Sequence, residues 1–439
     1  MDVVIYLSDN TGHQFTLPNG KTTPASQLLQ IMIATLKLPD VLAKKCFSLW
    51  LKSPLLDVQL KPQHIPFRMV KQWPMFIERF SMCSDLEKSH DEPAILFRRN
   101  AFLTREEEMQ ITDESILEVL LLEAKHNIQQ GIYPCDAEDI EQLGALLCLT
   151  MEEAPGKGIQ KTARENLPTL VPEHMAKPRR HFLSRQQSME ERIIKCAKKA
   201  SQERAVNPTL EFMKICWQLP YYGSVMFHGM VERALNSTLA SWFSAQTEIP
   251  VRAAINTDGI WIIDIHKKHV LIGLLYDEFN WEVTDGRSEN AEEEQIPSLF
   301  LEFDDKKTNE NQLLQIMSKE APMMNSMIET CIAMKHDREQ QETESQTVTD
   351  GAKGNSSKSM AAVLSTTRVR PLFERQNSVT KSHPEKLNFT KLVEPGEQSA
   401  SSPTQSHPKA VSSNKRGFLK KLGSHQKIIT SKEERDELL

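Results

Sequence analysis

The spacing of apolar side chains predicts elements of different kinds in successive segments of the chain. In residues 1–100, short apolar stretches lie between polar or turn residues, and one stretch repeats at helical spacing. We predict strands over residues 3–7, 13–17, 47–51, 56–60 and 94–97, and a helix that begins at Thr23-Pro24 and runs to about residue 36. Asp9-Asn10-Thr11-Gly12 tolerates positive φ and joins the first two strands as a hairpin. This part is therefore a small lobe of mixed α/β structure.

Residues 101–221 show the period of helices instead. Apolar positions between residues 116 and 128, and again between residues 143 and 151, recur every three or four residues. Asp136, Glu138 and Asp139 place negative charge at the positive end of the second of these helices. A calcium loop is the alternative, but the glycine and the terminal glutamate of that pattern are absent.

Within this helical lobe, residues 152–204 turn polar. A connection of this length usually signals function or disorder, so we predict a flexible insertion there. Asn207-Pro208, a helix cap followed by a first-turn proline, begins the last helix of the lobe.

Residues 222–337 are predicted to form seven strands and one closing helix. The strands are residues 225–231, 251–255, 260–265, 270–275, 279–283, 299–303 and 313–317. The helix, about residues 319–334, carries Met324, Met327, Ile328 and Cys331 along one stripe. Seven strands closed by one helix is the pleckstrin-homology or phosphotyrosine-binding (PH/PTB) superfold.

Residues 338–439 contain few apolar side chains and many Ser, Thr, Gln, Lys and Pro residues. Such a segment cannot bury enough surface to offset its conformational entropy, so we predict a disordered tail. From residue 338 onward there are 17 Lys and Arg against 12 Asp and Glu, a net charge of +5, whereas the preceding residues carry −11. An acidic body argues against nucleic-acid binding, which needs clustered cations.

Patterns of catalysis and of cofactor binding are absent from the sequence. There is no glycine-rich phosphate loop with Lys and Ser/Thr, no HExxH, no nucleophile elbow, and no cysteine followed six positions later by arginine. The seven cysteines include no CxxC pair, which argues against a disulfide framework or a zinc site. We expect a non-enzymatic protein without a cofactor. No apolar run approaches the ~20 residues that cross a bilayer, and the start lacks a basic leader, so we expect a cytoplasmic chain.

The order of these parts resembles a known family. Two strands, a helix and three more strands is the ubiquitin-like order, and a helical and a PH/PTB-like lobe follow it. Leu219-Pro220-Tyr221-Tyr222-Gly223 is similar to the junction between the second and third lobes of FERM proteins, and residues 50–62 with Gln72-Trp73-Pro74 resemble strands and the following turn of their first lobe. Through these motifs residues 1–337 are identified as a member of the FERM family.

The resemblance implies an α+β multidomain cloverleaf: a ubiquitin-like lobe (1–100), a helical lobe similar to acyl-CoA-binding protein (101–221) and a PH/PTB-like lobe (222–337), followed by the tail. It also implies an adaptor for cytosolic tails of membrane proteins, recruited to the cytosolic face of the plasma membrane and of secretory-pathway membranes. Similar proteins look like partners of inactive rhomboid (iRhom) proteins that support an attached metalloprotease sheddase, with a link to Wnt co-receptors. The long charged helix and actin-binding end of ezrin-type members are absent from the tail sequence. A phosphoinositide-directed linker between membrane and cortex is the alternative.

The candidate peptide site lies in the third lobe. In the PH/PTB superfold the fifth strand, here residues 279–283, has an open edge to which an extended peptide can add. Trp281, Val283 and the stripe Met324, Met327, Ile328 and Cys331 are the candidate groove residues. The alternative is that the stripe only packs the helix on the sheet.

Two serines and one basic run are further candidates. Ser188 and Ser378 each follow an arginine by three positions, and phosphate there would create an epitope of the kind that 14-3-3 proteins bind. Cations alternate with apolar side chains in a run near the C-terminus that can hold to anionic lipid, the alternative being a solvated tail. The candidate contacts in that run are Lys415, Arg416, Phe418, Lys420 and Lys421.

Overall fold

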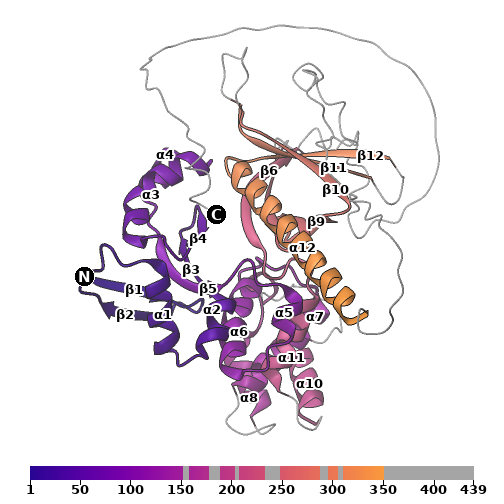
Figure 1. The fold of residues 1–439 in the computed structure, drawn as a ribbon. Coiled ribbons are helices and arrows are strands. Elements are labelled where there is room, and N and C mark those ends of the chain that lie inside the picture. Colours follow the sequence, from indigo (N-terminus) through magenta and orange to yellow (C-terminus); the bar gives the residue numbers. More distant parts are fainter. Residues whose placement is uncertain are drawn as a thin grey trace, which may run out of the picture.

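The computed structural model describes residues 1–151, 158–176, 188–202, 207–232, 248–286, 295–304 and 310–350, with side chains up to residue 340. Figure 1 shows three lobes that meet around a common centre. The α+β cloverleaf predicted from the sequence is confirmed.

The first lobe is a five-stranded sheet with helices packed on it. Its elements are β1 (Asp2–Tyr6), β2 (Gly12–Thr16), α1 (Ala25–Thr35), α2 (Asp40–Cys46), β3 (Phe47–Lys52), β4 (Asp57–Gln59), α3 (Pro66–Phe80), α4 (Asp85–Ser89) and β5 (Ala94–Arg99). The strand order is β2-β1-β5-β3-β4, with β1 and β5 parallel. The predicted hairpin is present, and Asn10 takes the positive φ, 68°, that its turn requires.

The helix α3 differs from the prediction, which placed a turn at Gln72-Trp73-Pro74. Proline in a helix interior removes a hydrogen bond and costs about 3 kcal/mol. Here Met69, Trp73, Ile77 and Phe80 form a buried stripe along one side of α3, and Trp73 Nε1 donates to Asp91 Oδ2 at 2.9 Å. Burial of that stripe offsets the local cost of Pro74.

The second lobe is helical. It contains α5 (Arg105–Met109), α6 (Glu114–Gln129), α7 (Ala137–Thr150), α8 (Ile159–Leu170), α9 (Glu173–Ala176), α10 (Met189–Gln202) and α11 (Pro208–Gln218). Two predicted helix starts are confirmed: the Asp136 side chain accepts from Asp139 N at 2.9 Å, and the Asn207 side chain accepts from Leu210 N at 3.2 Å. Asp136 is therefore a helix cap.

Part of the predicted flexible insertion, residues 152–204, is helical core. α8 and α10 bury Ile159, Ala163, Ile193 and Ala197 against α7 and each other. Both helices are rich in charged residues on their outer sides, so their composition resembles a loop although their apolar residues recur at helical spacing. Of this stretch, residues 152–157, 177–187 and 203–204 lie outside the described residues.

The third lobe follows the predicted order of strands. Its elements are β6 (Val225–Glu232), β7 (Glu248–Ile255), β8 (Gly259–Asp264), β9 (His269–Leu275), β10 (Phe279–Thr284), β11 (Ser298–Asp304), β12 (Asn311–Met317) and α12 (Ala321–Asp350). The sheet order is β10-β11-β12-β6-β7-β8-β9, and every neighbouring pair is antiparallel. The helix α12 crosses this sheet and continues toward the helical lobe (Figure 1).

The helix α12 is longer than predicted. The sequence analysis ended it near residue 334 and began the tail at residue 338, but the helix extends to Asp350. Its last part contains several Gln and Glu residues, which are good helix formers, and no Gly or Pro interrupts it before Gly351. The predicted tail therefore begins later than residue 338, and residues 351–439 lie outside the described residues.

Ser188 begins α10 and provides a first test of the fold. Its Oγ accepts from Glu191 N at 3.2 Å, while its own N donates to Glu191 Oε2 at 3.0 Å, which is a reciprocal capping box. Ser188→Ala should lower the free energy of unfolding by about 1 kcal/mol, because a backbone N–H loses its partner. Ser188→Asn, which keeps an acceptor, should cost much less. Equal urea-denaturation midpoints for Ala and wild type would contradict this assignment.

Candidate functional site

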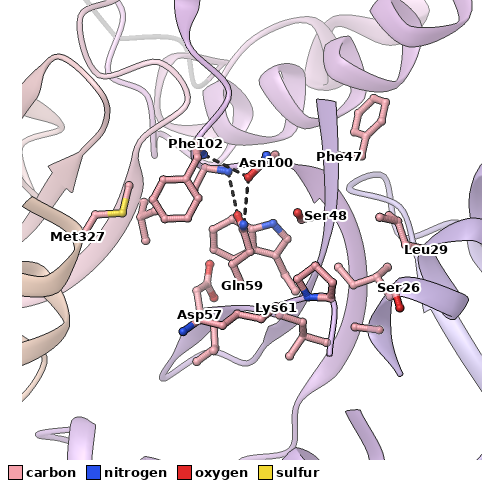
Figure 2. A pocket seen from close by; sticks show the side chains of 18 of the residues that line it. Ser26, Leu29, Phe47, Ser48, Asp57, Gln59, Lys61, Asn100, Phe102 and Met327 are labelled. Atoms are coloured by element: carbon pink, nitrogen blue, oxygen red, sulfur yellow. Dashed lines mark hydrogen bonds between the residues drawn. The ribbon is translucent and has the colours of Figure 1, made fainter. Parts of the chain in front are cut away.

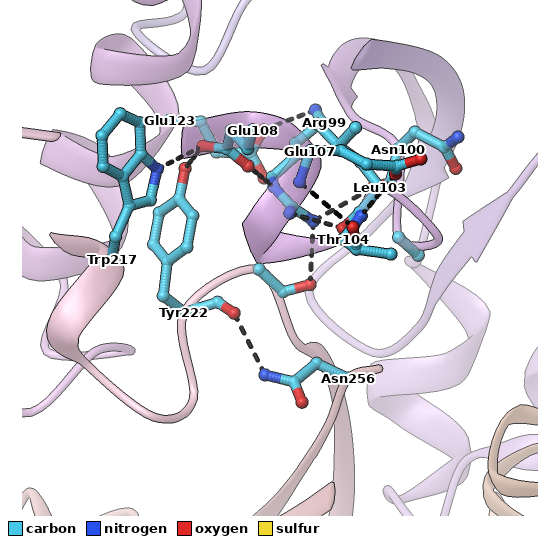
Figure 3. A network of polar contacts seen from close by, with 12 residues as sticks. Arg99, Asn100, Leu103, Thr104, Glu107, Glu108, Glu123, Trp217, Tyr222 and Asn256 are labelled. Carbon is cyan, nitrogen blue, oxygen red and sulfur yellow. Dashed lines mark hydrogen bonds and ion pairs between the residues drawn. The ribbon is translucent and has the colours of Figure 1, made fainter. Parts of the chain in front are cut away.

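The three lobes meet at one buried carboxylate. Glu108, on the short helix α5, is fully buried, and Arg99, at the end of β5, is 6% exposed. Arg99 Nε donates to Glu108 Oε2 at 2.6 Å. Glu108 Oε1 accepts from Trp217 Nε1 of α11 at 2.9 Å and from the hydroxyl of Tyr222 at 2.6 Å (Figure 3). One carboxylate thus joins the first lobe, the helical lobe and the segment that leads into the third.

The guanidinium of Arg99 is held by backbone groups as well. Its Nη2 donates to Leu103 O at 2.7 Å and its Nη1 to Gly223 O at 3.5 Å. Gly223 has a φ of 72°, and a Cβ there would lie 2.6 Å from Arg99 Nη1, so only glycine fits. Burial lowers the pKa of Arg99, but the Glu108 carboxylate beside it outweighs that effect and raises it. Arg99 therefore stays charged.

A second ionic network lies between the first lobe and the helical lobe. Asp57 of β4 accepts from Lys52 Nζ at 2.7 Å and from Arg98 Nη1 at 3.1 Å, and Arg98 Nη2 lies 3.0 Å from Glu123 Oε1 of α6. The Arg98 guanidinium also stacks 4.8 Å from the ring centroid of Trp50. Burial would raise the pKa of Asp57, but Lys52 and Arg98 outweigh it and hold the pKa below its usual range.

Beside this network is a cavity of about 490 Å³ between the first and third lobes. Most of its wall is apolar, with side chains from α1, β3 and β4 on one side and from β6 and α12 on the other. The lining includes Leu29, Phe47, Trp50, Val58, Leu60, Val225, Phe227, Met323 and Met327. A mostly apolar concavity of this size with a few polar groups is the usual form of a binding site.

Polar groups converge on one side of the cavity. Gln59 Nε2 donates to Asn100 Oδ1 at 3.0 Å, and that oxygen also accepts from Phe102 N at 3.2 Å (Figure 2). Gln59 Oε1 accepts from Ala101 N at 2.8 Å. Other polar residues of the lining are Ser26, Lys44, Ser48, Asp57 and Lys61. The amides are held by the backbone, so they offer a fixed polar surface beside an apolar one.

The predicted peptide groove consists of the edge of β10 and the side-chain stripe on α12, and the structure treats the two differently: the edge is unpaired among the described residues, whereas the stripe is buried. β10 is the terminal strand of its sheet, and no other described strand pairs with its second edge. Trp281 and Val283 are partly buried, and Trp281 Nε1 donates to Asn325 Oδ1 of α12 at 2.9 Å. In the part of the chain that the structure describes, the second edge of β10 is therefore unpaired, and α12 contacts this strand.

The side chains of the stripe on α12 are not accessible to solvent. Met324, Met327, Ile328 and Cys331 are fully buried, as expected for a helix packed on a sheet, which is the alternative given above. Met327 also lines the inter-lobe cavity. Binding of a peptide across this stripe remains a prediction, and the structure adds the cavity as a second candidate surface.

The remaining candidates lie mostly outside the described residues. Ser378 and the basic run of Lys415, Arg416, Phe418, Lys420 and Lys421 lie there. Ser188 is described and exposed, and its hydroxyl caps α10. Among the described residues no cluster of His, Cys, Asp and Glu is placed to hold a metal ion, and no helix combines the length and apolar character needed to cross a membrane.

Sequence reasoning missed Glu108 and Arg99. Thr104 and Glu107 form a capping box, with Glu107 N donating to Thr104 Oγ1 at 3.3 Å, so Thr-x-x-Glu could have located the start of α5. Glu108 follows two other glutamates in the chain, and nothing in that run marks which of the three is buried. Only the tertiary fold separates Glu108 from its neighbours.

Family models agree with this architecture. The model described as FERM central domain matches residues 106–227, and the model described as KRIT1/FRMD8, FERM domain C-lobe, matches residues 249–327. Among solved structures, the C-terminal MyTH4-FERM domain of human Myosin 7b, in complex with the harmonin-a PDZ3 domain, has a TM-score of 0.50 at 14% identity. That match covers 76% of this chain and 60% of the solved chain, and it supports the fold alone. The fold and these matches define a FERM protein.

Relatives in sequence identify the family more narrowly than the family models do. FERM domain-containing protein 8 of Mus musculus is 36% identical over 416 residues, and that of Homo sapiens is 35% identical over 414 residues. Each match covers 90% of this chain and 85% of the relative. The chain belongs to the family of FERM domain-containing protein 8. FERM domains bind cytosolic tails of membrane proteins, and this membership supports an adaptor or scaffold.

Removing Glu108 should destabilise the junction strongly. Glu108→Ala leaves the buried charge of Arg99 and two aromatic donors without their acceptor, and should lower the free energy of unfolding by about 3–5 kcal/mol. Glu106→Ala, in the same helix and with an exposed side chain, should change it by less than about 0.5 kcal/mol. Urea denaturation measures both, and a Glu108 variant no less stable than its control would refute the role.

The ionic network around Asp57 predicts acid sensitivity. Its pKa is lower in the folded chain than the unfolded value of about 3.9, so its contribution to stability is complete above that pH and is lost as pH falls through the folded pKa. Asp57→Asn should make the free energy of unfolding depend less steeply on pH below about 4. Unchanged steepness in denaturation series at several pH values would contradict this.

Proposed function

We propose that this protein is a non-enzymatic adaptor that holds a cytosolic tail of a membrane protein in the cavity between the first and third lobes. The cavity is the observation that carries the proposal: it is mostly apolar, about 490 Å³ in volume, and bordered by amides fixed to the backbone. An apolar side chain of a tail would fill it, while the amides would fix the direction of the tail backbone.

Family membership narrows the class of tail. The resemblance described above and the relatives of about 36% identity support the cytosolic region of an inactive rhomboid protein as the first candidate, with stability and surface delivery of an attached metalloprotease sheddase as the result. The cytosolic tail of a Wnt co-receptor is the second. Binding of either would bring the chain to the cytosolic face of the plasma membrane or of secretory-pathway membranes.

The unpaired edge of β10 is an alternative binding site for the same tail. A strand added there would gain backbone hydrogen bonds and lie beside Trp281 and Val283. The cavity and the edge involve different side chains, so substitutions can separate them.

The test is a calorimetric titration of the full chain with the purified cytosolic region of an inactive rhomboid protein. Ser48→Trp places an indole in the cavity and should weaken binding by about thirtyfold or more, the loss typical of a central contact. Gln14→Trp, on the exposed side of β2 in the same lobe, is the matched control and should leave the affinity unchanged.

The edge of β10 is tested with Trp281→Ala in the same titration. Loss of affinity with Trp281→Ala but not with Ser48→Trp would move the site to β10. Absence of binding by the unsubstituted chain, to this tail and to that of a Wnt co-receptor, would refute the proposed partners.

A further inference from the structure

The inter-lobe cavity lies alongside the edge of the sheet in the first lobe. β4 is a terminal strand of that sheet, and the six consecutive residues 57–62 all line the cavity. Val58 and Leu60 are buried on one face of the strand, and Asp57 and Gln59 lie on the other face. A space that is lined from both faces of one strand lies beside the edge of that strand.

Hydrogen bonds to β3 show which backbone groups of β4 face this space. Leu60 N donates to Leu49 O at 2.8 Å, so the backbone of Leu60 is directed toward β3. The direction of the N–H and C=O groups alternates along an antiparallel strand, so Val58 faces β3 as well. The N–H and C=O groups of Asp57 and Gln59 therefore point away from β3, along the edge that borders the cavity.

These outward groups form no hydrogen bond within the part of the chain that the structure describes. That holds for the backbone N–H and C=O of both Asp57 and Gln59. The next outward position, Lys61, is already bonded: its N donates to His64 Nδ1 at 3.1 Å, and its O accepts from His64 N at 3.0 Å. Two donors and two acceptors thus follow one another along a short edge, which is the pattern that an added strand satisfies.

Apolar surfaces flank this edge on both sides. A strand beside β4 would send alternate side chains to opposite faces of the sheet. On one side they would meet Leu29 of α1, and on the other Val225 of β6 and Met327 of α12 (Figure 2). We propose that the tail segment held in the cavity is extended and adds to the first lobe as a sixth strand, paired with Asp57 and Gln59 of β4.

The pairing defines the chemistry of the segment, and this inference rests on the proposed function because the occupant is the tail. Both flanking surfaces are apolar, so adjacent residues of the segment, and not only alternate ones, are apolar. Asp57, the acidic residue of the lining, already pairs with Lys52 and Arg98, so the segment needs no charge at this point. Proline is excluded where the segment must donate an N–H to β4.

The test compares Gln59→Pro with Gln59→Ala in a calorimetric titration of the full chain with the purified cytosolic region of an inactive rhomboid protein. Both substitutions remove the side-chain amide and its bonds to Asn100 and Ala101, but only proline also removes the outward N–H. Proline should therefore weaken binding about tenfold more than alanine does, as expected for one lost hydrogen bond.

The opposite edge of the same sheet provides a matched control. β2 is the other terminal strand, and Leu17 N donates to Met1 O at 2.9 Å, so the alternation directs the N–H of Gln14 outward. Gln14 is exposed and does not line the cavity. Gln14→Pro should leave tail binding unchanged. Circular dichroism and urea denaturation should show that both proline variants remain folded.

Amide hydrogen exchange tests the strand without any substitution. Binding of the same cytosolic region should slow exchange at Asp57 and Gln59, because their N–H groups gain acceptors. Exchange at Val58 should change little, since its N–H already faces β3. Mass spectrometry with fragmentation that resolves single residues measures this period of two.

The possible outcomes separate this inference from the proposed function. Tail binding with unchanged exchange at Asp57 and Gln59, or with equal affinity of the two Gln59 variants, would refute the sixth strand. If Ser48→Trp still weakened binding in that case, the cavity would remain the site. An equal loss with Gln14→Pro and Gln59→Pro would also refute the strand, because it would be a general effect of proline. Absence of binding by the unsubstituted chain would refute both proposals for this tail.

Discussion

The relative placement of the three lobes depends on the carboxylate of Glu108. It is the common acceptor for Arg99, Trp217 and Tyr222, which come from three separate parts of the chain. An unpaired buried charge costs several kcal/mol, so these parts are stable together and costly apart. The glycine at position 223 belongs to the same constraint, because a side chain there would meet the guanidinium. The junction therefore behaves as one unit.

The cavity is a product of this placement. Neither the first nor the third lobe contains it alone, since β3 and β4 form one wall and β6 and α12 form the other. Asp57 of β4 forms ion pairs with Lys52 and Arg98, which position β4 beside the helical lobe. Trp50 of β3 contacts the junction, because its Nε1 donates to Arg99 O at 3.1 Å. The shape of the cavity and the integrity of the junction are thus linked through Trp50 and β5.

Sequence patterns predicted the strands and the order of the lobes, because period-two alternation and turn residues are local signals. They failed where tertiary packing overrides local preference. Both α3 and α8 contain an internal proline, at positions 74 and 168. In each helix, apolar side chains buried on one side stabilise the helix despite the proline, and local sequence rules do not include that packing. The methionine stripe of α12 was located correctly, but whether it faces a groove or the core depends on how α12 packs on the sheet of the third lobe. The buried role of Glu108 has no local signal at all.

The helix α12 touches all three lobes. Two residues before its start, Lys319 Nζ donates to Glu78 O of the first lobe at 3.2 Å, and within the helix Asn325 Oδ1 accepts from Trp281 Nε1 of β10 at 2.9 Å. Farther along, Arg338 lies 3.8 Å from Glu106 of the helical lobe. Met323 and Met327 of the same helix form part of the cavity wall. One continuous helix thus carries a wall of the cavity and an ion pair to the helical lobe, so the position of that wall is tied to both neighbouring lobes.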